Sequence, residues 1–151
     1  YMLESTNVRI ESELEIKAYL QNLKYNLDHG AQIQFQIKRR VDEEKEEQFT
    51  NQYTIAKLFP DKNPIEALRI ELMSLTVEDY MRTVKDIRFP NRSEMREFGK
   101  YYDGEGDVYI KIRVELLGNY GNSMTFVMSF HFAERPFSIG MFPYRKQREV
   151  G

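Results

Sequence analysis

The chain has 151 residues, 41% of them hydrophobic and 13% aromatic, which is enough for one domain with a buried core and too few for two ordinary domains. It has no cysteine, which excludes a disulfide framework, a thiolate metal site and a cysteine nucleophile, and two histidines do not favour a histidine-rich metal site. The net charge of -2 argues against a uniformly basic nucleic-acid binder, so such a site would depend on local charge.

We therefore expect one domain over 1–151, with its core over about 11–133 and an irregular aromatic tail over 134–151, and neither a cofactor nor a metal. No apolar run approaches the length needed to cross a bilayer, and the first residues lack the apolar stretch of a secretory signal. The sequence thus predicts a cytoplasmic protein with no membrane partner. It leaves the oligomeric state open.

A helix and then a strand are predicted in the first forty residues. Ser12 and Glu15 match a capping box, and Gly30 is suited to end the helix in a left-handed conformation. Between them, an apolar stripe recurs at steps of four and three residues, formed by Ile16, Leu20, Leu23 and Leu27. From Ala31 to Lys38 the period changes to two, which predicts a strand.

The next segments are ambiguous until a second helix begins. The acidic run from Asp42 to Glu47 predicts a turn, and the alternation from Phe49 to Ile55 favours a returning strand, although residues 43–58 are also compatible with a helix. Asn63 followed by Pro64 is a cap with proline at the first helical position, which predicts a helix to about Met73.

Short helical pieces and a loop are predicted in the middle of the chain. Thr76 resembles a cap for a helical turn that continues through Arg82, and Ser93 is placed to cap a short helix through Phe98. Gly99, Gly104 and Gly106 then mark a loop. Basic residues outnumber acidic ones in the stretch 82–100, which indicates either a solvated surface or phosphate contacts.

The last third predicts a hairpin with one apolar and one polar face, formed by residues 107–117 and 123–133. If the connection Gly118–Asn122 is symmetric about Tyr120, Tyr109 lies opposite His131 and Lys111 lies opposite Ser129. The apolar face of the second strand is expected to be core and consists of Met124, Phe126, Met128, Phe130 and Phe132. The aromatic tail that follows is expected to pack along the sheet.

The order of these elements predicts an α+β fold, in which an antiparallel sheet packs against N-terminal and central helices. It resembles the MqsR group of RelE-like messenger-RNA-cleaving toxins. The resemblance covers about residues 11–132. The matching motifs are Leu75-Thr76-Val77-Glu78-Asp79-Tyr80, Val108-Tyr109-Ile110-Lys111-Ile112 and Ser129-Phe130-His131.

The resemblance implies a RelE-like, metal-independent endoribonuclease that cleaves single-stranded RNA by attack of the ribose 2′-hydroxyl, with RNA and a cognate antitoxin as partners. It places His131 where the family carries a basic residue, and an imidazole suits proton transfer near neutral pH. Tyr109 matches the strand tyrosine that would share this transfer. Arg82 occupies the position of the family's lysine after the Asp-aromatic pair, where a guanidinium would hold phosphate.

Four further basic residues are candidates for contacts to the RNA backbone. The resemblance places Arg96 near a polar loop residue of the family, with Lys85 and Lys111 as further phosphate contacts. Arg113 lies on the polar face of the predicted hairpin. A non-catalytic interaction module, of immunity, antitoxin-like or phage-encoded type, is the alternative, and it would bind a protein through the sheet face and the aromatic tail.

Overall fold

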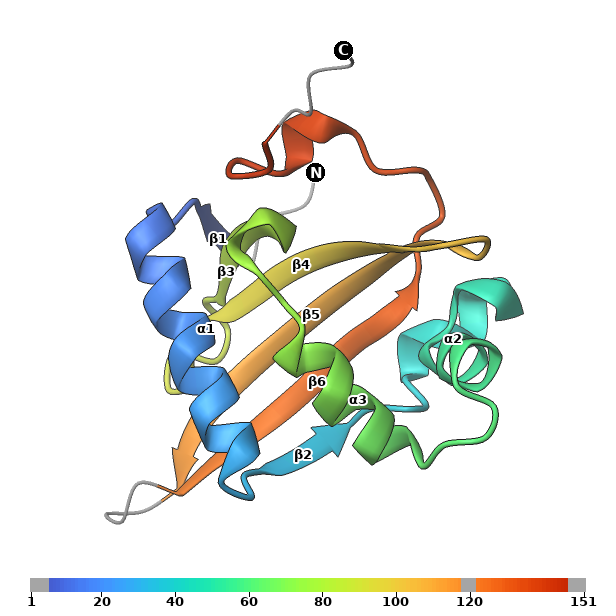
Figure 1. Cartoon of the computed structure of the whole chain (residues 1–151), viewed down its shortest axis with the longest axis horizontal. Coiled ribbons are helices and arrows are strands. Elements are labelled where there is room, and N and C mark those ends of the chain that lie inside the picture. The colour runs from blue at the N-terminus through green and yellow to red at the C-terminus, as the bar shows by residue number, and fades with distance from the viewer. Residues whose placement is uncertain (1–5, 118–121, 147–151) are drawn as a thin grey trace.

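The computed structural model describes residues 6–117 and 122–146, which form an α+β fold around one six-stranded sheet (Figure 1). The strands are β1 (Thr6–Arg9), β2 (Gln32–Phe35), β3 (Tyr80–Asp86), β4 (Met95–Tyr102), β5 (Gly106–Leu117) and β6 (Asn122–Phe132). The α-helices are α1 (Glu13–Asp28), α2 (Asn51–Leu58) and α3 (Pro64–Met73), and the short 3-10 helices are η1 (Arg40–Glu44), η2 (Glu47–Phe49), η3 (Val77–Asp79) and η4 (Ile139–Met141). The predicted fold class is confirmed.

The sheet order is β1-β3-β4-β5-β6-β2. All neighbouring strands run antiparallel except β2, which lies parallel to β6. The first and second predicted helices are also confirmed. Ser12 and Glu15 form the reciprocal capping box of α1, Gly30 has a φ of +84°, and Asn63 caps α3.

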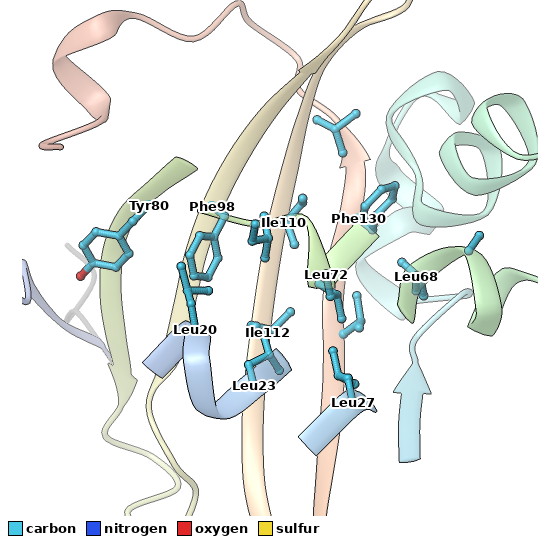
Figure 2. Packing of buried hydrophobic residues seen from close by; sticks show 14 of the residues in the cluster. Leu20, Leu23, Leu27, Leu68, Leu72, Tyr80, Phe98, Ile110, Ile112 and Phe130 are labelled. Carbon is cyan, nitrogen blue, oxygen red and sulfur yellow. The ribbon is translucent and has the colours of Figure 1, made fainter. Parts of the chain in front are cut away.

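The helices α1 and α3 cover the same face of the sheet and bury the core there (Figures 1 and 2). Leucines from both helices point toward aromatic and isoleucine side chains on the strands; the fully buried residues include Leu23, Leu27, Leu68, Leu72, Phe98, Ile110, Ile112 and Phe130. Because side chains alternate along a strand, the residues between these point to the opposite side. We call that side the outer face of the sheet.

A β-bulge decides which residues of β6 reach the outer face. Tyr109 pairs with His131 and Lys111 with Ser129, which confirms the predicted register at this end of the hairpin. The register then shifts between Lys111 and Ile112, so that Ile112 faces Val127. An extra residue in one strand reverses the alternation beyond it. The predicted connection centred on Tyr120 lies outside the described residues.

The bulge makes part of the predicted core stripe wrong. Phe130 is fully buried and Phe132 packs beside the core, as expected. Past the bulge, however, Val127 and Thr125 are the fully buried residues, whereas Phe126 is half-buried and lies under the guanidinium of Arg113. The period of two holds on each side of the bulge, but its phase differs.

Three predicted elements in the middle of the chain are wrong. The helix predicted over 93–98 does not form: Ser93 donates to Glu115, and β4 begins at Met95, where the chain pairs with β3 and β5. The turn after Thr76 ends at Asp79, and β3 replaces its predicted continuation. Residues 51–58 form α2, so the helical alternative holds there and the predicted hairpin does not.

The helix α2 is positioned by bonds to the edge of β6. The strand β2 pairs with residues 124–127 of β6, so the backbone groups of the later residues of β6 have no neighbouring strand on that side. Asn51 accepts from Phe130 N at 3.0 Å and donates to Met128 O at 3.1 Å, and Thr54 Oγ1 accepts from Phe132 N at 2.9 Å. These side chains satisfy backbone groups that would otherwise be open to another strand.

The aromatic tail packs against the sheet as predicted, within the described residues 134–146. Phe137 N donates to the carboxylate of Asp107 at 2.8 Å, Phe142 is buried, and the Tyr144 hydroxyl donates to the carbonyl of Glu11. Phe137 and Phe142 approach Gly99 of β4 so closely that no larger residue fits beneath them.

We expect Gly99→Ala to lower the free energy of unfolding by about 1–3 kcal/mol, the usual cost of overpacking a filled site. A Cβ atom there would lie 2.6 Å from Phe137 Cε2, 2.8 Å from Met81 Cε and 2.9 Å from Phe142 Cζ. Urea denaturation measures the change. Gly140→Ala is the matched control, because a Cβ there meets nothing within 4 Å. Equal losses in both variants would contradict the packing of the tail on Gly99.

Candidate outer-face site

Polar side chains form a row across four strands on the outer face. Arg82 pairs with Glu97, Glu97 with Lys111, and Lys111 with Ser129, each on the next strand of the sheet. Arg39, in the segment after β2, donates from Nη1 to Ser129 Oγ at 3.0 Å. We call these five residues the polar row. It gathers three cations around one carboxylate on the face that α1 and α3 leave uncovered.

Glu97 is the centre of the polar row, and the sequence analysis missed it. Its side chain is nearly buried, with 3% of the residue exposed, and its Oε1 accepts from Arg82 Nε at 2.7 Å. The cap-like Ser93 favours a helix over 93–98, and residues 95–102 show no alternation of apolar and polar residues that would signal a strand. Only the pairing of β4 with β5 places Glu97 beside Lys111.

Tyr109 and His131 lie side by side on the outer face, next to the polar row. Tyr109 is two residues before Lys111 on β5, and His131 is two residues after Ser129 on β6. They are paired across β5 and β6, and their ring centroids are 5.4 Å apart at an angle of 40°. His131 Nδ1 is 3.0 Å from the carbonyl oxygen of Phe132. Since a carbonyl only accepts, this contact assigns the proton to Nδ1, and in the neutral ring Nε2 then carries the lone pair.

The surroundings of Tyr109 hold its hydroxyl in the protonated form. Burial raises the pKa of Tyr109 well above its ordinary value, and the negative charge of nearby Glu97 raises it further. A hydroxyl in this state can donate a hydrogen bond, gives up its proton only to a strong base such as a departing alkoxide, and does not act as a base near neutral pH. His131 and Tyr109 therefore offer different chemistry: one ring can accept a proton and the other can supply one.

Lys111 lies in an environment that disfavours its charge. Burial lowers the pKa of Lys111, and the positive charges of Arg39 and Arg82 lower it further, while Glu97 opposes the change. The hydrogen bond to Glu97 raises the pKa of Arg82, which therefore stays charged. A bound anion beside Lys111 would favour its ammonium form, so the polar row is suited to a negatively charged ligand.

Arg113 lies on the same face, two residues further along β5. Its Nη1 is 2.7 Å from Glu115 Oε1, and its guanidinium lies 4.2 Å from the ring centroid of Phe126. The structure therefore places His131, Tyr109, Arg82, Lys111 and Arg113 on one face. The ring of Phe126, expected in the core, becomes part of that face instead.

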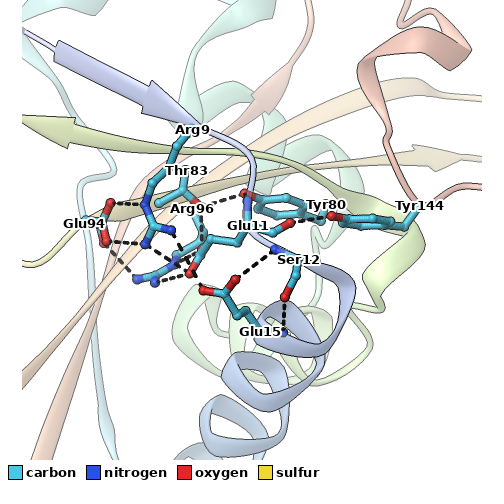
Figure 3. Close-up of polar contacts among 9 residues, drawn as sticks. All are labelled: Arg9, Glu11, Ser12, Glu15, Tyr80, Thr83, Glu94, Arg96 and Tyr144. Atoms are coloured by element: carbon cyan, nitrogen blue, oxygen red, sulfur yellow. Dashed lines mark hydrogen bonds and ion pairs between the residues drawn. The ribbon is translucent and has the colours of Figure 1, made fainter.

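Arg96 is not on this face. It points toward α1 and donates to Glu11 from Nε at 2.9 Å and from Nη2 at 3.0 Å (Figure 3). Its guanidinium also lies 4.3 Å from the ring centroid of Tyr19. Glu11 also accepts from Thr83, and its backbone N–H donates to the hydroxyl of Tyr80 at 3.0 Å. Arg96 therefore joins β4 to the start of α1, and we remove it from the candidate site.

Lys85 also lies away from the polar row. It shares the side of β3 that carries Thr83, and its Nζ donates to the carbonyl of Pro90 at 3.1 Å and to that of Arg92. These contacts close the loop between β3 and β4. The sequence could not separate Lys85 and Arg96 from Arg82, because the side of a strand depends on the register and on the bulge between Tyr80 and Arg82.

Within residues 6–117 and 122–146, no group of three or more His, Cys, Asp or Glu side chains is placed to hold a metal ion. The same described segments contain no helix with the length and apolar character that a membrane crossing requires. Comparisons of the chain with protein-family models, curated proteins and solved structures each found no match.

We expect Arg96→Gln to destabilise the protein by about 2–3 kcal/mol, because it breaks two charge-assisted hydrogen bonds to the nearly buried Glu11 carboxylate and leaves it only the more exposed Arg9, at 3.3 Å, as ionic partner. Lys17→Gln is the control: both side chains of its ion pair with Glu13 are about half exposed, so we expect a loss of about 0.5 kcal/mol or less. Urea denaturation of both variants measures the difference. Similar losses would contradict the assignment of Arg96 to the fold.

The Glu11 contacts also predict a pH dependence of stability. Burial pushes the pKa of Glu11 up, but the bonds from Arg96 and Thr83 outweigh it, so the pKa lies below its ordinary value. A depressed carboxyl pKa contributes stability above the unfolded value of about 4.3, and this is lost as pH falls through the folded value. Glu11→Gln should therefore show a smaller loss of melting temperature than the wild type on acidification below pH ~4. Equal losses of melting temperature in Glu11→Gln and the wild type over this pH range would contradict this role of Glu11.

Proposed function

We propose that the protein is a metal-independent, RelE-like endoribonuclease that cleaves single-stranded messenger RNA in the cytoplasm, with the outer face of the sheet as its active site. The observation that carries the proposal is the contact of His131 with Tyr109 beside the polar row. A proton acceptor, a proton donor and several cations are what cleavage by a neighbouring hydroxyl requires. The sequence resemblance to RelE-like toxins supports the same activity.

The proposed reaction is attack of a ribose 2′-hydroxyl on the adjacent phosphate. The bond from 2′-oxygen to phosphorus forms, and the bond from phosphorus to the 5′-oxygen of the next nucleotide breaks, leaving a cyclic phosphate and a 5′-hydroxyl. His131 Nε2 takes the proton of the 2′-hydroxyl. Tyr109, which burial and Glu97 keep protonated, donates to the departing 5′-oxygen.

Positive charge from the polar row holds the phosphate in this reaction. Arg82 reaches it from β3 and Lys111 from β5, and their charges stabilise the oxygens that become more negative in the transition state. Glu97 fixes the orientation of Arg82 through the 2.7 Å contact, which lowers the cost of ordering the guanidinium. Ser129 holds Arg39 at the other end of the row in the same way.

A non-catalytic interaction module is the second candidate. The tail occupies the sheet beside Gly99, the strand position paired with Tyr109, so part of the outer face is already covered. Ile139 and Met141 on η4 are exposed next to it and would serve as apolar anchors for a protein partner. A toxin also needs such a surface for its cognate antitoxin, so the two candidates differ in the chemistry of His131.

The test is cleavage of a long, mixed-sequence RNA by purified protein in EDTA, with and without ribosomes. We expect His131→Ala to lower the cleavage rate by roughly a hundred-fold or more, as loss of one proton-transfer group does. His29→Ala is the matched control, because His29 lies at the exposed end of α1 and its Nδ1 is 2.8 Å from the carbonyl oxygen of Tyr25.

Tyr109→Phe supplies the complementary variant, since it keeps the ring and removes the proton. We expect a loss of cleavage comparable to that of His131→Ala. Melting temperatures of both variants must match the wild type, so that a loss of rate is not a loss of fold. Well-folded wild type that cuts no RNA under either condition would overturn the nuclease and favour the interaction module.

A further inference from the structure

The loop between β3 and β4 carries an exposed aromatic ring between two arginines. Phe89 is 41% exposed, and the guanidinium carbons of Arg92 and Arg88 lie 3.9 Å and 5.6 Å from its ring centroid. A single exposed ring is ordinary on a protein surface, so the significance of Phe89 lies in the two guanidinium groups beside it. This loop contains the centre of the basic stretch 82–100, and neither the fold nor the proposed reaction accounts for it.

The loop is held in shape before any ligand binds. Lys85 donates to the carbonyls of Pro90 and Arg92, Phe89 N donates to Asp86 O at 3.2 Å, and Arg92 N donates to Phe89 O at 3.0 Å. A preformed loop loses little conformational entropy when it binds. Lys85 is therefore a positioning residue for Phe89 rather than a contact to the substrate.

The loop is also tied to the outer face. Ser93, at its end, donates to both carboxylate oxygens of Glu115, from N at 2.5 Å and from Oγ at 3.0 Å. Glu115 in turn accepts from Arg113, whose guanidinium covers Phe126. Beyond Lys111 on β5, the outer face thus carries the guanidinium of Arg113 over the ring of Phe126. The loop between β3 and β4, which Ser93 joins to Glu115, carries the guanidinium of Arg92 over the ring of Phe89.

Alternating cations and aromatic rings are what proteins use to bind single-stranded nucleic acid. Cations follow the phosphates, while bases stack on rings whatever their sequence. Over residues 85–94, Lys85, Arg88 and Arg92 outnumber Asp86 and Glu94, so the charge favours a polyanion. An acidic protein would satisfy the charges but would leave Phe89 without a stacking partner.

We infer that Phe89 and Arg92 form a stacking platform for a base and phosphate of the RNA strand several nucleotides from the scissile bond. This inference rests on the proposed function for the identity of the strand. It specifies the substrate class: a single strand long enough to span from the polar row to the loop, bound there without base-edge recognition.

The test uses single-stranded DNA of mixed sequence, which lacks the 2′-hydroxyl and cannot be cut by the proposed reaction. Fluorescence anisotropy gives the Kd of a labelled 12-mer and a labelled 3-mer. We expect Phe89→Ala to reduce the preference for the 12-mer over the 3-mer by about tenfold, the size of one lost base stack. Tyr25→Ala, which removes a 62% exposed ring on α1, is the matched control and should leave this preference unchanged.

Arg92→Gln gives an independent readout. Loss of one phosphate contact should reduce the slope of log Kd against log salt concentration by about 1 for the 12-mer. The backbone carbonyl that accepts from Lys85 remains in this variant, so the loop keeps its shape. Melting temperatures equal to the wild type show that Phe89→Ala and Arg92→Gln act on binding.

Binding and cleavage are separate measurements, so the two proposals can fail separately. Length-dependent binding that needs Phe89, in a protein that cuts no RNA, would support the platform and reject the nuclease. Cleavage of long RNA with a 12-mer preference that survives Phe89→Ala would overturn the platform alone. A polyglutamate competitor that displaces the 12-mer equally from wild type and Phe89→Ala would also overturn it, in favour of a charged protein partner.

Discussion

The one-sided coverage of the sheet is the constraint on which the rest of the structure depends. With α1 and α3 on a single face, the strand residues beneath them are mostly apolar, and the residues between these are released from the core. The outer face can therefore carry Arg82, Glu97, Lys111 and Tyr109 on neighbouring strands without disturbing packing. A sheet covered on both faces would bury these charges at a cost of several kcal/mol each.

Two arginine–glutamate pairs show how the face decides the role of a residue. Arg82 and Arg96 both lie within the basic stretch 82–100, and both contact a nearly buried carboxylate. Arg96 is on the core side and has only 15% of its side chain exposed, so its charge holds β4 to the start of α1. Arg82 is half exposed on the outer side, where its remaining donors can meet a ligand.

The tail and the helix α2 support the two sides of the candidate site. The tail fills the space over Gly99 next to Tyr109, and Asn51 and Thr54 of α2 bind the edge of β6 on either side of Phe130. These contacts fix the backbone that presents Tyr109 and His131. Rigid support of this kind is what a proton-transfer pair needs, because small displacements of reacting groups cost much of the rate.

The sequence by itself determined the elements whose signals are local. The capping box at Ser12, the stripe of α1, the Asn63-Pro64 start of α3 and the pairing of Tyr109 with His131 all follow from spacing along the chain. Only the tertiary structure decided β4, α2 and the sides taken by Lys85, Arg96 and Phe126. These depend on strands distant in sequence and on two β-bulges, and one inserted residue reverses a face without leaving any mark in the local pattern.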